Sequence, residues 1–179
     1  MGRIFLLTGR PGSGKTTIML EVAERLKGRG LRIGGMVTRE VRREGTRIGF
    51  EVSNLATGER GVLARVGSGG GPRIGKYIVN LGDLEAVGVE AIRQALKEAD
   101  VVFVDEVGPM ELYSQAFRQA VLEVMESGKP LVATVHYKAK DSLIEKLKAK
   151  AGSLLEVKPE SRRLILENLT VEVLKALEG

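Results

Sequence analysis

The feature that most constrains the fold of this chain is a glycine-rich segment near its N-terminus. Residues Gly9–Thr16 read GRPGSGKT and match the pattern G-x-x-x-x-G-K-[ST] at every fixed position. An apolar run, Arg3–Thr8, precedes the segment, and a helical pattern, Gly14–Lys27, follows it. A strand–loop–helix unit of this kind directs backbone N–H groups and the positive end of a helix dipole at a phosphate. The segment therefore predicts a phosphate-binding loop in an α/β protein.

Each residue type in this loop predicts a contact with a nucleotide. The glycines let the backbone approach the phosphates without a Cβ in the way. Lys15 is expected to reach the β- and γ-phosphates and to contribute to catalysis, and the Thr16 hydroxyl is expected to bind Mg²⁺. Thr17 is a candidate contact for the α-phosphate. The nucleotide-binding candidates in the loop are Gly9, Arg10, Pro11, Gly12, Ser13, Gly14, Lys15, Thr16 and Thr17.

Apolar runs and helical patterns alternate along the rest of the chain. Strands are expected at residues 32–38, 101–105, 130–135 and 153–157, and helices at residues 83–98, 114–125, 140–150 and 159–177. Because these strands are continuously apolar and are separated by helices, they predict a mostly parallel sheet with helices on both faces. Two segments around the turn signal NLATG predict an inserted β-hairpin at residues 46–66, before a glycine-rich loop at 67–72. We expect a single domain, residues 1–179, with the insertion at about 39–80.

The strand VVFVDEVG, Val101–Gly108, ends in two acidic residues. Asp105 is expected to hold Mg²⁺, through water, and Glu106 to orient and deprotonate the attacking water. A catalytic Glu in this position usually accompanies an extra strand between the phosphate-loop strand and the acidic strand. Residues 130–135 are predicted to be that strand, which would bring Thr134 and His136 towards the γ-phosphate. The sequence leaves open whether His136 positions water or is structural.

The basic residues concentrate in the inserted region. The net charge of the chain is +5, and residues 38–76 hold eight basic and four acidic side chains. These charges indicate either a solvated face or a surface for phosphates or nucleic acid. Aromatic residues make up 4% and tryptophan is absent, so stacking platforms for nucleic acid are scarce and this partner is not favoured. Candidates for stabilising γ-phosphate charge are Arg39, Arg47, Arg73 and Lys76, among which the sequence does not choose.

The composition excludes several other classes of site. The chain contains no cysteine and one histidine, so it has no disulfides, no thiolate metal sites and no His-rich metal site. Its apolar runs are shorter than the roughly 20 residues that cross a membrane, and its first residues lack the pattern of a signal peptide. We expect a soluble, cytoplasmic monomer that makes no membrane contact.

Several segments together resemble the thermophile-type nucleoside triphosphatase family of P-loop proteins, relatives of the human cancer-related nucleoside triphosphatase. These segments are GRPGSGKTT, GGMVTREVRREGTRIGFEV, RIGKYIVNL, VVFVDEVGPMELYS and ATVH. The resemblance covers nearly the whole chain and implies a three-layer, RecA-like fold. It also implies slow, Mg²⁺-dependent hydrolysis of several nucleoside triphosphates.

The resemblance also implies a second nucleotide-binding motif, with Asp105 and Glu106 as its working acids. That motif would comprise Val101, Val102, Phe103, Val104, Asp105, Glu106, Val107 and Gly108. Some members have an E-N-R sequence near the C-terminus, and here it reads Glu160-Ser161-Arg162. Arg162 is therefore an accessory candidate, and the asparagine contact is absent.

These observations predict a Mg²⁺-dependent enzyme that hydrolyses ATP, GTP, CTP and UTP to the diphosphate and phosphate. No segment resembles the guanine-reading N-K-x-D, so we expect a broad base specificity. Two alternatives stay open. One is a small-molecule or nucleotide kinase, which would need an acceptor before phosphate leaves ATP. The other is a nucleic-acid-binding ATPase that uses the basic hairpin, which would bind DNA or RNA in a salt-sensitive manner.

Overall fold

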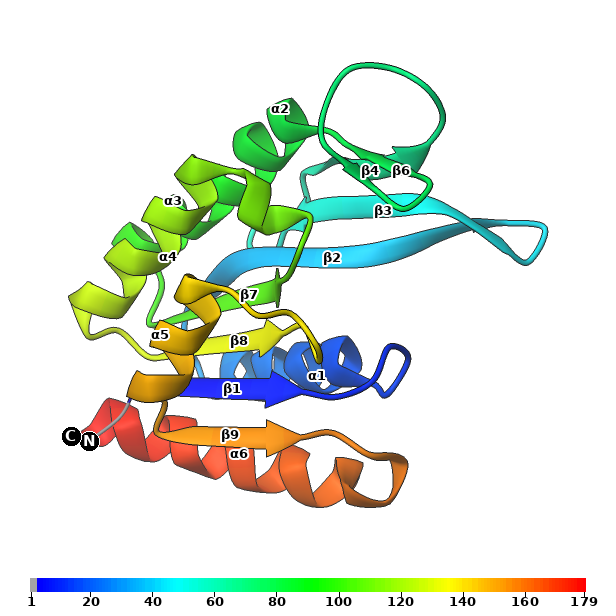
Figure 1. Cartoon of the computed structure of the whole chain (residues 1–179). Coiled ribbons are helices and arrows are strands. Elements are labelled where there is room, and N and C mark those ends of the chain that lie inside the picture. The colour runs from blue at the N-terminus through cyan, green and yellow to red at the C-terminus, as the bar shows by residue number, and fades with distance from the viewer. Residues whose placement is uncertain (1–2) are drawn as a thin grey trace.

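The computed structural model describes residues 3–179, and in this part of the chain nine strands form one sheet (Figure 1). Their order across the sheet is β5-β6-β4-β3-β2-β7-β8-β1-β9. The strands are β1 (Ile4–Thr8), β2 (Ile33–Arg43), β3 (Thr46–Asn54), β4 (Arg60–Val66), β5 (Arg73–Ile74), β6 (Tyr77–Val79), β7 (Val101–Val107), β8 (Leu131–Val135) and β9 (Ser153–Glu156). The helices are α1 (Lys15–Gly28), α2 (Leu81–Asp83), α3 (Glu90–Glu98), α4 (Gln115–Ser127), α5 (Ser142–Lys150) and α6 (Arg162–Glu178).

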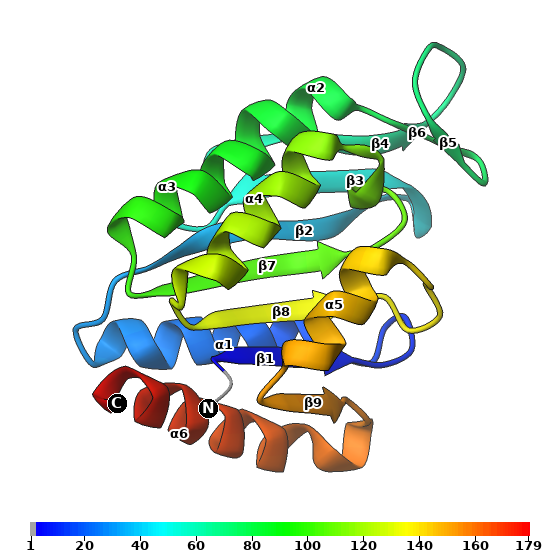
Figure 2. The ribbon, with the colours of Figure 1, turned by 60° about the vertical axis from the view of Figure 1, so that its left-hand side comes forward.

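Helices cover both faces of the sheet, as predicted (Figures 1 and 2). Helices α1 and α6 lie on one face, where Met19 and Leu26 pack in one buried cluster with Phe103 of β7. Helices α3, α4 and α5 lie on the other face, where Ile92 and Phe117 belong to a second buried cluster. The continuously apolar strands thus bury both of their faces. For this reason apolar and polar residues do not alternate along their sequence.

The parallel half of the sheet has the predicted order. Strand β8 lies between β1 and β7 and pairs in parallel with both. The carboxyl ends of three neighbouring strands therefore meet at one edge of the sheet. These ends carry the phosphate loop, the acidic pair and His136, so the fold brings together the segments from which a site was predicted.

The predicted end of the second strand was wrong. Strand β2 does not end at Thr38 but continues to Arg43, where it turns and pairs antiparallel with β3. Strands β4, β6 and β5 then extend the same sheet. The predicted turn NLATG does connect β3 to β4. The charged end of β2 forms a strand because β3 supplies hydrogen-bond partners to its backbone, although its side chains from Arg39 to Arg43 are exposed.

Several element boundaries differ from the predicted ones. Strand β7 runs past the acids to Val107. The helix predicted at 83–98 begins with α2 and a π-helical segment, Leu84–Val89, before α3. The helix predicted at 159–177 begins as a 3₁₀ turn, Pro159–Ser161, before α6. In the described residues, no helix is both long enough and apolar enough to cross a membrane.

Helix α5 begins at Ser142 and not at Lys140 as predicted, and a cap and an ion pair stabilise its start. The Asp141 carboxylate accepts a hydrogen bond from the backbone N–H of Leu143, at 2.8 Å, and so caps the helix. The same carboxylate accepts two bonds from the guanidinium of Arg118 on α4, at 3.0 and 2.7 Å. Arg118 in turn donates to the Leu112 carbonyl. Asp141 therefore ties α5 to α4 and to the chain that follows β7.

We expect Asp141→Ala to lower the free energy of unfolding by about 1–3 kcal/mol, because it removes a helix cap and a partly buried pair. Arg118 holds the pKa of Asp141 below its usual range. The stabilisation is therefore complete above the pKa of about 3.9 that Asp has in an unfolded chain, and is lost as the pH falls through the folded value. Urea unfolding at pH 7 and at lower pH measures both effects. Glu167→Ala, which breaks an exposed pair with Arg163, is the control and should cost about 0.5 kcal/mol or less. Equal losses for the two variants would contradict the prediction.

Candidate functional site

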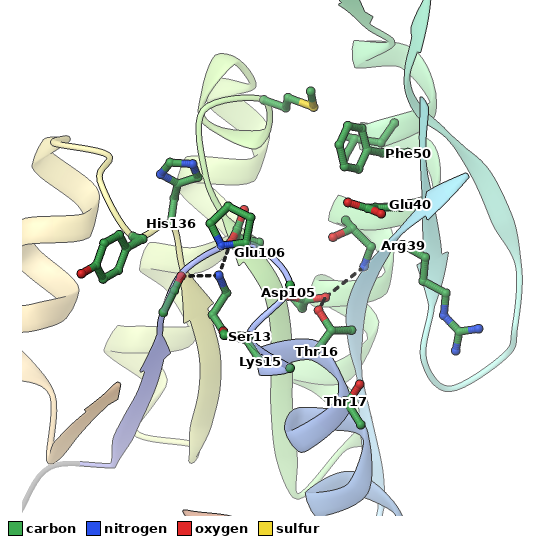
Figure 3. Close-up of a pocket in the computed structure, with 18 of the residues that line it drawn as sticks. Ser13, Lys15, Thr16, Thr17, Arg39, Glu40, Phe50, Asp105, Glu106 and His136 are labelled. Atoms are coloured by element: carbon green, nitrogen blue, oxygen red, sulfur yellow. Dashed lines mark hydrogen bonds and ion pairs between the residues drawn. The ribbon is translucent and has the colours of Figure 1, made fainter. Parts of the chain in front are cut away.

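A cavity of about 610 Å³ opens at the carboxyl edge of the sheet, above the phosphate loop. Residues of the loop, of the segment after β7 and of the insertion line it (Figure 3). Gly14 precedes α1 with a φ of 101°, and Gly12 has a φ of 80°, values that L residues with side chains rarely adopt. The glycines thus permit the turn that leaves the backbone donors at the start of α1 facing the cavity. The loop has the geometry of an anion site.

Lys15 is one of the residues that line this cavity. Its Nζ donates to the Gly9 carbonyl at 2.8 Å and lies 3.6 Å from Oε2 of Glu106. The side chain is only 11% exposed, so its charge acts in a poorly hydrated place. The structure therefore brings together the two residues that were predicted from the sequence to be catalytic, although they are 91 positions apart in the chain.

The second predicted acid, Asp105, is buried and receives three hydrogen-bond donors. Thr16 Oγ1 donates to Asp105 Oδ2 at 2.9 Å, and the backbone N–H of Thr38 donates to the same oxygen at 3.4 Å. Thr134 Oγ1 donates to Asp105 Oδ1. Burial raises the pKa of Asp105, and the hydrogen bonds from Thr134 and Thr16 oppose that rise. Thr134 thus contacts the acid and not the cavity, and Thr38 is a contact that the sequence did not indicate.

The contact between Thr16 and Asp105 tests whether this site fits Mg²⁺. It joins a hydroxyl and a carboxylate, which are hard oxygen ligands of the kind that Mg²⁺ prefers. Within residues 3–179, no three or more His, Cys, Asp or Glu side chains form a metal cluster. A site with few protein ligands suits an ion that keeps several waters and binds mainly through nucleotide phosphates. The residues present therefore fit Mg²⁺ bound together with a nucleotide.

Glu106 has the environment of a general base. Burial raises its pKa to about 7, and the positive charge of Lys15 opposes the rise. A base whose pKa lies near neutral pH is most effective at that pH. The carboxylate lines the cavity near Lys15 (Figure 3). The Asp105–Glu106 peptide bond is cis.

A third acid, Glu111, lies in the same place and was not assigned any role from the sequence. It begins the short 3₁₀ turn Glu111–Tyr113 after β7 and is 4% exposed. Burial, followed by repulsion from Glu106, raises its pKa well above the usual value. Its surroundings therefore favour the protonated carboxyl more than those of an exposed glutamate do. Its position in the segment GPMEL was visible in the sequence, but its burial was not.

The contacts of His136 bear on whether this residue positions water or has a structural role. Its Nδ1 accepts hydrogen bonds from the backbone N–H groups of Lys138 and Ala139, at 3.2 and 3.1 Å. Burial, aided by Lys15, lowers the pKa of His136. The lowered pKa favours the neutral imidazole, and its Nδ1 is occupied by the two backbone hydrogen bonds. His136 lines the cavity and orders the turn after β8, but it is not placed to act as a base.

The accessory arginines lie in three different environments. The Arg47 guanidinium donates to Tyr77 Oη at 2.8 Å and to Glu40 Oε1 at 2.9 Å, so it is held within the insertion. Arg39 is exposed on β2 at the margin of the cavity (Figure 3). Arg162, at the start of α6, donates through Nε to the Ser13 carbonyl at 3.0 Å. Arg162 therefore contacts the phosphate loop directly, as the sequence alone could not show.

Most of the predicted second motif does not reach the cavity. Val101, Val102, Phe103 and Val104 are fully buried in the sheet. From Val101–Gly108, only Asp105 and Glu106 line the cavity. The apolar residues hold β7 between β2 and β8 and so position the two acids. In the phosphate loop, Thr17 lines the cavity and Arg10 stacks on the Tyr137 ring at 5.9 Å.

The chain is similar to known proteins over most of its length. The family model described as NTPase matches residues 4–170. A nucleoside-triphosphatase THEP1 from Thermofilum pendens is 57% identical over 138 residues, which cover 77% of this chain and 76% of that protein. The crystal structure of THEP1 from Aquifex aeolicus superposes with a TM-score of 0.84 at 31% identity, covering 95% of this chain and 98% of that one. The solution structure of a human cancer-related nucleoside triphosphatase superposes with a TM-score of 0.78 at 33% identity, covering 96% and 97%.

Proposed function

This chain belongs to the NTPase family, and from that premise we propose that it hydrolyses nucleoside 5′-triphosphates to the diphosphate and phosphate, with Mg²⁺ and without strong preference for the base. One observation carries the proposal. Lys15, the cation of the phosphate loop, lies 3.6 Å from Glu106, a carboxylate with a pKa of about 7. A phosphate-binding cation and a base in contact are two groups that promote hydrolysis of a γ-phosphate.

The roles of the residues follow from these contacts. The loop backbone and Lys15 bind and orient the phosphates, and Lys15 exchanges its bond to the Gly9 carbonyl for a phosphate oxygen. Thr16 and Asp105 would hold Mg²⁺, which when bound neutralises charge on the β- and γ-oxygens. Glu106 orients a water molecule and takes its proton as the water oxygen attacks the γ-phosphorus. The diphosphate then leaves with the electrons of the broken phosphoanhydride bond.

The described contacts also support a broad base specificity. At the phosphate loop, the polar side chains of Lys15, Thr16 and Asp105 are placed to contact phosphates and the metal and not a base. Arg162 lies against the phosphate loop, where its planar guanidinium can stack on any base. Stacking contributes affinity without reading the edge of the base.

We expect ATP, GTP, CTP and UTP to be hydrolysed within about tenfold of one another in kcat/KM, a spread of roughly 1.4 kcal/mol. The measurement is phosphate release from each triphosphate with Mg²⁺ and, in parallel, with an excess of EDTA. Release should fall to background in EDTA because the charge on the γ-phosphate is then not neutralised. A preference above about a thousandfold for one base would imply a pocket that reads base edges and would contradict the proposal.

A further inference from the structure

The cavity above the phosphate loop extends well beyond the place of the phosphates. On the side of the insertion its walls are apolar, and they are formed by Phe50 of β3, Leu63 of β4, Ile74 of β5 and Met110 after β7. We call these four residues the apolar lobe. Neither a water molecule nor the phosphates of a nucleotide form favourable contacts with apolar walls. Covering apolar surface from water gains about 25 cal/mol per Å², so the lobe favours a ligand with an apolar ring.

The contacts of Lys15 and Thr16 indicate that the base of a bound triphosphate would lie outside this lobe. Lys15 and Thr16 both reach from the phosphate loop towards the acids of β7. The γ-phosphate, which these groups bind, therefore lies at the β7 side of the loop. The nucleoside is then expected on the opposite side of the loop, where β9 and Arg162 lie. The insertion adjoins β7 through β2, so the apolar lobe lies beyond the γ-phosphate, on the side from which a nucleophile attacks.

The charged side chains that line the lobe are paired, and Glu40 also pairs with Arg42, which lies outside the cavity lining. Glu40 and Arg47 line this side of the cavity and form an ion pair at 2.9 Å (Figure 3 labels Glu40 beside Phe50). The pair still offers carboxylate lone pairs and guanidinium N–H groups to a polar ligand. It therefore suits a neutral molecule whose ring carries both donors and acceptors, more than it suits an anion.

The wall formed by Phe50 is held in place. Its ring meets that of Tyr77 edge-on with 5.2 Å between centroids, and the Arg47 guanidinium lies over it at 5.2 Å. Arg47 is in turn held by Tyr77 Oη and Glu40. A ring fixed on two sides is preorganised for stacking, so a ligand need not order it on binding.

We propose that the apolar lobe binds a second substrate, a neutral ring-bearing alcohol of the nucleoside class, whose hydroxyl accepts the γ-phosphoryl group in place of water. This activity rests on the proposed hydrolysis, because it uses the same nucleotide site. The hydroxyl oxygen forms a bond to the γ-phosphorus, and the bond from that phosphorus to the β-bridging oxygen breaks. The hydroxyl proton passes to the Glu106 carboxylate, and the bond electrons leave with the nucleoside diphosphate. The products are a nucleoside monophosphate and a nucleoside diphosphate.

The test is transfer of label from γ-³²P-ATP with Mg²⁺ to adenosine, guanosine, cytidine or uridine, each at millimolar concentration. Labelled phosphate and labelled nucleoside monophosphate are separated and measured in the same reaction. We expect label in at least one nucleoside. Phe50→Ala removes the ring on which the nucleoside would stack, and Ile74→Glu places a charge in the apolar wall. Each variant should therefore lower this transfer about tenfold or more. Phosphate release without a nucleoside should stay within about threefold of the wild-type rate for both variants.

The matched control is Val66→Glu, which adds the same charge at an exposed position of the insertion outside the cavity lining. It should leave transfer unchanged. Three results would overturn the proposal: label only in free phosphate with every nucleoside, preferential transfer to nucleoside monophosphates, or a Phe50→Ala variant whose KM for ATP rises instead. Failure of the proposed hydrolysis is distinguishable, since the wild-type protein would then release no phosphate when no nucleoside is present.

Discussion

Replacing Lys15 with alanine is expected to abolish hydrolysis of every triphosphate and to weaken their binding. Lys15 is the cation of the phosphate loop that lines the cavity, and it lies against both the Gly9 carbonyl and Glu106. Its removal deprives the β- and γ-phosphates of a nearby positive charge in a poorly hydrated cavity, where charge interactions are strong. It also leaves Glu106 facing an anionic substrate without a countercharge. The pKa of Glu106 should then rise, since Lys15 is the group that lowers it.

The measurement is phosphate release under multiple turnover beside calorimetric binding of ATP with Mg²⁺. Lys27→Ala is the matched control, because it removes an exposed lysine from the last turn of the same helix, α1. That control should bind and hydrolyse ATP like the wild-type protein. Wild-type turnover by a folded Lys15→Ala protein would refute the assignment of the phosphate loop.

Glu106→Gln is expected to lower kcat by about 10²- to 10⁴-fold, the usual range for loss of a general base. The amide keeps the size of the side chain and can still hold a water molecule, but it cannot take the proton. Affinity for ATP with Mg²⁺ should therefore stay within about threefold, because the bonds to the phosphates come from other residues. Asp105→Asn should act differently. It disturbs the contact with Thr16, so binding and the Mg²⁺ requirement should weaken together.

Single-turnover hydrolysis and calorimetry separate these two outcomes. The control is Glu24→Gln, the same chemical change on an exposed position of α1, and it should have no effect on either quantity. A Glu106→Gln protein that turns over at the wild-type rate would show that another group accepts the proton. His136 is a poor replacement, because its Nδ1 already accepts two backbone hydrogen bonds.

The local sequence patterns were sufficient to predict a parallel sheet covered by helices. Uninterrupted apolar strands between helices predicted a parallel sheet covered on both faces, and the two buried clusters on its faces confirm this. The Asp105–Glu106 pair predicted an extra strand between β1 and β7, and β8 occupies that place. The edge of the sheet was harder to predict. Strand β2 extends to Arg43 only because β3 returns beside it, and such pairing leaves no signal in a run of charged residues.

Within the site, the groups with the right chemistry could be identified from the sequence: a phosphate loop, a cation, a hydroxyl and two acids. These follow from residue type and local spacing, which need no knowledge of the remaining chain. The tertiary structure decided which of them work together and in which protonation state. Burial raises the pKa of Glu106 to about 7, a pair with Glu40 restrains Arg47, and the start of α6 brings Arg162 to Ser13. These properties depend on neighbours distant in sequence, because desolvation and hydrogen bonding act through space.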